Sequence, residues 1–174
     1  KGSHWVGDLI FEADVETAAD TQGLLMEIVE AGVRYQVELD LKTGSATLAI
    51  LDGDQRRMFT GDGKSVESVT AKTGVVAGER VSVRLSNADD QLVLWIDDNV
   101  IEFDGPTTFD HRDYRLAADD RPHFKPGEHP LDAAPLGIAV RGGGATVRRL
   151  KVDRDKYYIA TEADRKSTRL NSSH

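Results

Sequence analysis

Apolar and polar residues alternate with a period of two along most of the chain. The clearest alternation is in residues 33–40, where Val33, Tyr35, Val37 and Leu39 are separated by charged or polar residues. Successive side chains of a β-strand point to opposite faces, so this pattern places one face of a strand on a core. The pattern predicts strands at residues 5–17, 24–29, 33–40, 46–50, 81–85, 92–96, 100–103, 136–140 and 145–152. No segment with the spacing of an amphipathic helix competes with these strands.

Turn residues between these segments predict how the strands connect. Thr43-Gly44 joins residues 33–40 to the next strand as a hairpin, and Ala31-Gly32 adds the preceding strand to make a three-stranded meander. A second meander covers residues 81–103. The turn Gly142-Gly143-Gly144 predicts a final hairpin between the last two strands.

Together these strands predict an all-β fold, with two antiparallel sheets packed face to face as a sandwich of jelly-roll type. A single sheet would leave one apolar face in water, so a second layer is needed. After Gly105-Pro106, about 30 residues rich in Pro, Asp and His show no periodicity. We expect a long loop there.

The chain is predicted to hold one domain with short segments at its ends. Residues 5–153 form the sandwich, and residues 1–4 are a leader in which Gly2-Ser3-His4 is compatible with native sequence or a cloning scar. Residues 164–174 correspond to one reading frame of a common sequencing adapter, so we interpret them as an artefact tail. Lys1 is not an initiator methionine, and the sequence is interpreted as beginning in mid-protein.

Composition narrows the classes of function. The formal net charge is -8 without a basic stripe, which argues against nucleic-acid binding. The chain has no cysteine, which excludes disulfides and thiolate metal sites. The longest apolar run, Leu92 to Ile96, is far too short to cross a bilayer. We expect no cofactor.

Clustered carboxylates raise the question of a calcium site. Asp and Asn also favour turns, because their side chains hydrogen-bond to the local backbone. Calcium prefers several oxygen ligands, which a sandwich rim could supply. We favour the turn interpretation and expect no metal at the five residues concerned, Asp89, Asp90, Asp97, Asp98 and Asp104.

Histidines in the long loop suggest a zinc or general-base cluster. Their spacing fits no compact metal motif, so a solvated acidic loop is the preferred interpretation. The residues are His111, His123 and His129 with Asp110, Asp113, Asp119 and Asp120.

Two further features invite a functional interpretation. Trp95 points away from the side of Leu94 and Ile96, so it could be a stacking platform for sugar or peptide. We favour a ring buried beneath the long loop, because Val93 makes the strand apolar on both faces. Arg148 and Arg149 are predicted to lie on a solvated edge that discourages sheet-to-sheet aggregation.

Several segments resemble known protein families. Residues 137–145, followed by 147–152, resemble the closing hairpin of concanavalin-like and laminin-G-like sandwiches, and residues 88–97 resemble an exposed turn and strand found there. The segments Trp5 to Leu9, Glu102 to Thr108 and Val152 to Ala160 together resemble the domain inserted into the catalytic region of some bacterial type I signal peptidases.

The second resemblance implies a membrane-anchored serine endopeptidase as the parent protein. Such an enzyme removes signal peptides from exported proteins on the extracytoplasmic face of the cytoplasmic membrane, with a serine nucleophile and a neutral lysine base. Residues 154–163 would then return toward a missing catalytic region. The family's serine precedes a methionine, but Met26 and Met58 follow Leu25 and Arg57. No catalytic residue is therefore assigned to this chain.

Three functional hypotheses follow. The first is a non-catalytic insert of signal peptidase I, which meets preprotein substrates through the parent and requires no membrane contact of its own. The second is a laminin-G-like carbohydrate- or protein-binding domain of an extracytoplasmic protein. The third, a glycoside hydrolase, needs two carboxylates about 5 to 9.5 Å apart across a cleft, and the strands offer no such pair. Neither the ligand nor the oligomeric state is predicted.

Overall fold

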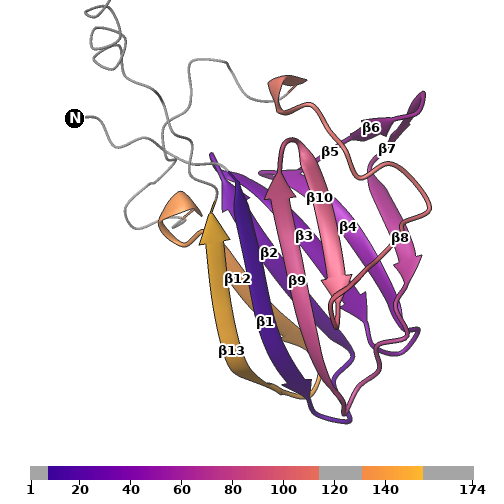
Figure 1. The fold of residues 1–174 in the computed structure, drawn as a ribbon, viewed down its shortest axis with the longest axis vertical. Helices are drawn as coiled ribbons and strands as arrows, with labels where there is room; N and C mark the ends of the chain where they lie inside the picture. Colours follow the sequence, from indigo (N-terminus) through magenta and orange to yellow (C-terminus); the bar gives the residue numbers. More distant parts are fainter. Residues whose placement is uncertain (1–7, 114–130, 155–174) are drawn as a thin grey trace, which may run out of the picture.

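A computed structural model describes residues 8–113 and 131–154 of the chain (Figure 1). The longer strands of this part are β1 (Leu9–Thr17), β2 (Gly23–Glu30), β3 (Val33–Asp40), β4 (Ser45–Asp52), β8 (Ser68–Lys72), β9 (Arg80–Ala88), β10 (Gln91–Ile96), β12 (Leu136–Arg141) and β13 (Ala145–Arg154). The shorter ones are β5 (Gln55–Arg57), β6 (Phe59–Gly61), β7 (Lys64–Val66) and β11 (Asn99–Val100). Two single 3₁₀ turns complete the list, η1 (His111–Asp113) and η2 (Leu131–Ala133).

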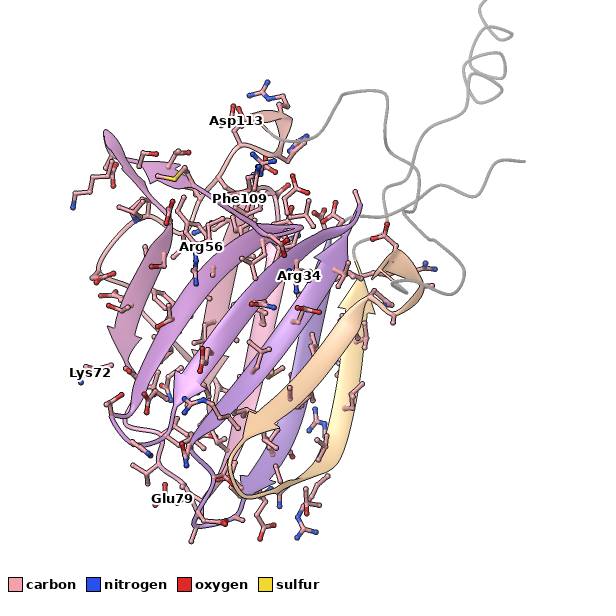
Figure 2. The ribbon with its side chains drawn as sticks, turned by 180° about the vertical axis from the view of Figure 1, so that it is seen from behind. Arg34, Arg56, Lys72, Glu79, Phe109 and Asp113 are labelled. Carbon is pink, nitrogen blue, oxygen red and sulfur yellow. The ribbon has the colours of Figure 1, made fainter. Side chains whose placement is uncertain are left out.

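Two antiparallel sheets form the sandwich. One has the order β11-β10-β9-β1-β13, and the other has the order β12-β2-β3-β4-β5, with β8 also paired to β4. Figure 1 shows the two layers one behind the other, and Figure 2 shows the second sheet from the opposite side. Strands β6 and β7 form a separate small ribbon. The predicted two-sheet sandwich is confirmed.

The core fills the space between the sheets, as the period-two pattern predicts. Tyr35 is 1% exposed and Val83 is fully buried, while Leu9 is partly buried and packs against the core. Each buried Leu, Ile, Val or Phe contributes about 1.5 to 3 kcal/mol of transfer free energy, which stabilises the fold without disulfides. The largest fully buried side chains are Tyr35, Phe11, Phe59, Leu24, Met26, Ile28, Leu39, Leu48, Ile50, Leu85, Leu92 and Leu94.

The predicted final hairpin is wrong, although both of its strands exist. β12 pairs with β2 in one sheet, and β13 pairs with β1 in the other. The turn between them therefore crosses from one sheet to the other, beside the connection between β1 and β2. The Ala18 N–H of that connection donates to the Gly144 carbonyl of the turn at 2.8 Å. A local alternation pattern cannot tell which sheet a strand joins, because that choice depends on distant partners.

Two other predictions need correction. The strand expected at residues 100–103 ends at Val100, because the chain then leaves β10 and reaches the other sheet, where the Asp104 N–H donates to the Thr70 carbonyl at 2.9 Å. Strands β5 to β8 were not predicted. Three of them have only three residues each, which is too short for an alternation to be visible.

The entry and exit of the described domain lie side by side. β1 and β13 are antiparallel neighbours, and Leu9 is paired with Arg154 (Figure 1). In the described residues, no helix has the length and apolarity needed to cross a membrane. Some of the predicted segments lie outside the described residues. They are the leader and the start of the first strand (1–7), most of the return segment (155–163) and the artefact tail (164–174).

The crossing turn gives a first testable prediction. Gly143 has φ 34, and an added Cβ would lie 2.6 Å from the Thr21 hydroxyl and 2.7 Å from its backbone nitrogen. We expect Gly143→Ala to lower the free energy of unfolding by about 1–3 kcal/mol, through strain and crowding. Gly144→Ala is the matched control, because an added Cβ there meets nothing within 4 Å. Equal urea midpoints for the two variants would contradict this role of the turn.

Candidate functional site

The five aspartates considered for calcium do not come together. Asp89 and Asp90 have φ values of 51° and 57° and form the two-residue turn from β9 to β10. Asp97 and Asp98, with φ values of 47° and 64°, form the turn from β10 to β11 at the other end of β10. Positive φ at both central positions is the geometry that tight hairpins require, and Asp tolerates it. The turn interpretation accounts for these four residues.

Asp104 has a different structural role. Its two carboxylate oxygens accept hydrogen bonds from the Thr70 N–H and the Thr70 hydroxyl, both at 2.7 Å. These bonds lower the pKa of Asp104 below its usual value. Asp104 also borders an open groove of about 700 Å³ next to Phe103 and Lys72. Because the Asp104 carboxylate already accepts hydrogen bonds from Thr70 of β8, we interpret its role as structural. It holds the segment that follows β11 against the second sheet.

A buried polar pair lies at one end of the sandwich, between the two sheets. Asn87 near the end of β9 is 3% exposed, and Glu30 at the end of β2 is 9% exposed. The Asn87 side-chain amide donates to the Glu30 carboxylate at 2.8 Å. The pair therefore links the two sheets at one end of the core. Its two polar side chains occupy inward-facing positions that are apolar elsewhere in these strands. Buried polar side chains are costly unless they are hydrogen-bonded, so their position is informative.

A hollow of about 200 Å³ opens beside this pair, and we call it the rim pocket. Its lining combines carboxylates with two aromatic rings from the core. Tyr35 and Phe109 are in contact, with ring centroids 5.3 Å apart. The residues that line the rim pocket are Asp8, Glu30, Tyr35, Asn87, Asp89, Asp90, Phe109 and His111.

The loop residues of the rim pocket are fixed by the β9–β10 turn. The ring nitrogen Nδ1 of His111 lies 2.6 Å and 2.9 Å from the two carboxylate oxygens of Asp90. The Phe109 N–H donates to the Asp90 carbonyl at 2.9 Å. Asp90 therefore positions the first part of the long loop, including η1, over the end of the core. Figure 2 shows Phe109 and Asp113 at this end of the molecule.

Asp110, next to the pocket, is held by its neighbour Arg112. The Arg112 guanidinium donates to both Asp110 oxygens, at 2.8 Å and 2.6 Å, and the Arg112 N–H donates at 3.0 Å. These contacts lower the pKa of Asp110 from 3.8 to about 2. Since the folded-state pKa is below the ordinary value, the interaction is fully present above pH 3.8 and is lost as the pH falls toward 2.

This pairing predicts a distinct titration. In a carboxyl NMR titration of the intact chain, Asp110 should have its midpoint near 2. Arg112→Gln removes the guanidinium and should move the midpoint up toward 3.8. A midpoint near 4 for Asp110 in the unmodified chain would contradict the pairing.

Among the described residues, one group of side chains has the spacing to hold a metal ion, and it joins two residues of the long loop to one of the β9–β10 turn. Asp90, Asp110 and His111 offer ligand atoms that all lie within 4.8 Å of one another. These atoms are already engaged, Asp90 with His111 and Asp110 with Arg112. We therefore interpret the three residues as an internal polar network. His123, His129, Asp119 and Asp120 lie outside the described residues.

Arg84 lies beside the ring of Trp95. The ring is half-buried, and the guanidinium carbon of Arg84 on the adjacent strand β9 lies 5.7 Å from its centroid. Arg84 and Trp95 therefore form a cation–π contact between neighbouring strands of one sheet. Arg148 and Arg149 lie on the edge strand β13, as predicted, and pair with Glu16 and Glu12 of β1.

Sequence reasoning missed Glu30 and Asn87, although a signal was present. Leu24, Met26 and Ile28 face the core, and the same period of two makes Glu30 the next inward residue. Val83 and Leu85 lead in the same way to Asn87. A polar residue in an inward position at a strand end is a sign of a buried polar contact. Their pairing across two sheets was not visible from local sequence.

Comparisons with known proteins identify the architecture. No family model and no curated protein sequence matches this chain. Among solved structures, a carbohydrate binding module, CBM66, from Bacillus subtilis is similar with a TM-score of 0.50 and 10% identity, over 84% of this chain and 75% of that chain. Sheep galectin-11 has a TM-score of 0.48 and 11% identity, over 87% of this chain and 94% of that chain. The likeness to the bacterial module shows the fold. Nothing in these comparisons bears on a signal peptidase.

Proposed function

We propose that this domain is a non-catalytic module that binds a neutral saccharide in the rim pocket. The observation that carries the proposal is the Asn87–Glu30 pair, whose polar groups occupy inward positions at strand ends and border the hollow. A side-chain amide and a carboxylate held by a hydrogen bond are pre-organised, so little freedom is lost when a ligand binds.

The lining selects the chemical class of the ligand. Carboxylates accept hydrogen bonds, and a sugar hydroxyl can donate to Asp8, Asp89 or Asp90 while its oxygen accepts from an amide. The same carboxylates repel an anionic ligand. The rings of Tyr35 and Phe109 provide an apolar wall, although both are largely buried.

The size of the hollow limits what can enter. A volume of about 200 Å³ is below the ~300–1,000 Å³ of pockets that hold drug-sized ligands. We therefore expect recognition of one terminal sugar unit. The similar bacterial structure is called a carbohydrate binding module, which supports this class of ligand for a sandwich of the same fold.

An array of immobilised glycans tests the proposal. We expect binding to neutral terminal sugars and at least about ten-fold weaker binding to uronic-acid, sialylated or sulfated glycans, because of the pocket carboxylates. Exposed hydrogen bonds contribute about 0.5–1.5 kcal/mol each, so a dissociation constant of about millimolar order is expected for a single site. Absence of binding to all neutral glycans, or preference for acidic ones, would contradict the proposal.

We further propose that the module is inserted in a larger protein, with signal peptidase I as the suggested parent. The pairing of Leu9 with Arg154 supports insertion, because a domain whose ends adjoin can interrupt a host without disturbing its fold. The motifs at residues 5–9, 102–108 and 152–160 are the basis for choosing this parent. The parent would be a membrane-anchored Ser-Lys endopeptidase on the extracytoplasmic face, and preproteins would be its substrates.

Reading the flanking gene sequence tests this second proposal. We expect an upstream transmembrane helix, a Ser-Met pair and a lysine, and a Gly-Asp-Asn-Ser stretch downstream. Preprotein cleavage by the parent with and without residues 5–153 would then show whether the module affects activity or specificity. A secretion signal followed by unrelated domains would contradict this choice of parent and leave saccharide binding untouched.

A further inference from the structure

Within the described residues, one edge of the sandwich is open and carries exposed apolar side chains. β13 is the last strand of its sheet, with β1 on one side and, among the described residues, no strand on the other. It is ten residues long and contains no proline. Its outer row of backbone N–H and carbonyl groups therefore has the geometry to pair with an added strand.

The inward-facing side chains of β13 are more exposed than their neighbours. Leu150 is opposite the buried Ala13, and Val152 is opposite the buried Phe11. Even so, Val147, Leu150 and Val152 are 41%, 56% and 44% exposed. Val140 on β12, the edge strand of the other sheet, is 39% exposed. Since β12 and β13 belong to different sheets, no ladder of hydrogen bonds between them closes this side.

The other face of β13 is basic. On this face Arg148, Arg149 and Lys151 stand against a single acid of the strand, Asp153, in a chain whose net charge is -8. Arg149 remains 57% exposed and Lys151 52% exposed in their ion pairs. In antiparallel pairs of two β13 strands centred on Leu150 or on Lys151, basic side chains of the two copies would lie directly opposite one another, which is unfavourable. An acidic strand would place opposite charges there.

We propose that β13 binds an extended acidic segment of a partner protein, which adds to the five-stranded sheet as an antiparallel strand. Apolar side chains at alternate positions of the segment cover Leu150 and Val152. The acidic side chains between them lie beside Arg149 and Lys151, because directly opposite residues of paired strands share a face. The rim pocket and this edge share no residue, so the inference does not depend on saccharide binding.

A synthetic ten-residue peptide of alternating valine and glutamate is the probe. We expect it to bind the full chain in fluorescence anisotropy and to slow hydrogen exchange of β13 amides. A peptide with lysine in place of glutamate should bind at least about ten-fold more weakly. Leu150→Asp should weaken binding of the acidic peptide at least about ten-fold. Val100→Asp is the matched control, because Val100 is 57% exposed on β11 at the opposite edge of the same sheet.

Five results would overturn the inference. The first two are that the acidic peptide does not bind, or that it binds no better than the lysine peptide. The third is that Val100→Asp weakens binding as much as Leu150→Asp does. The fourth is that the β13 amides are already protected in the chain alone, which would mean that another segment of the same chain covers the edge. The fifth is a dimer in sedimentation that Leu150→Asp dissociates, which would make a second copy the occupant.

Discussion

Asn87→Leu is expected to weaken saccharide binding by about 2- to 12-fold. The substitution keeps the approximate size of the side chain but removes the amide that faces both Glu30 and the rim pocket. A hydrogen bond from this amide to the oxygen of a neutral sugar contributes about 0.5–1.5 kcal/mol, which corresponds to this range of dissociation constants. Isothermal titration with the best neutral glycan from the array measures the change.

The same variant should also lower the free energy of unfolding by about 1–3 kcal/mol, because the Glu30 carboxylate loses a buried hydrogen bond. Asp104→Asn is the matched control for binding, since Asp104 borders the open groove at β8 and not the rim pocket. If Asp104→Asn reduced affinity and Asn87→Leu did not, the saccharide would bind in the groove, and the rim pocket would be only a structural contact between the sheets.

Leu48→Ala should produce the largest loss of stability, about 2–5 kcal/mol. Leu48 is fully buried in β4, between its partners Val37 on β3 and Val69 on β8. Truncation removes apolar contacts and leaves a cavity that a sheet bonded on both sides cannot close. Urea unfolding followed by circular dichroism measures the change.

Val76→Ala is the control for Leu48→Ala, because Val76 is 41% exposed. We expect it to change the free energy of unfolding by less than about 0.5 kcal/mol. A loss below about 1 kcal/mol for Leu48→Ala would mean that the layer between the sheets does not supply the main driving force for folding.

The strands with long alternation could be predicted from the sequence. The run from Val33 to Leu39 follows the expected burial residue by residue, and the β2–β3–β4 meander has the expected order. What local pattern could not supply was the partner of each strand. Val140 and Val147 belong to similar apolar alternations on either side of a glycine turn, yet they face the interior from different sheets.

The candidate site was predictable only in its parts. Asp89 and Asp90 were correctly interpreted as turn residues, and His111 was noted with Asp110. The contact of His111 with Asp90, 21 positions earlier, depends on how the loop returns over the core. The Asn87–Glu30 contact spans 57 positions and joins two sheets. Sequence alone can identify such inward polar residues but cannot pair them.

The most direct test of the central claim is an NMR titration of the intact chain with the neutral glycan that binds best. The account predicts that the side-chain amide signals of Asn87 and the backbone signals of residues 87–90 shift most, with His111 shifting together with them. Shifts confined to the β8 groove around Thr70 and Asp104, or no shift at saturating glycan, would contradict it.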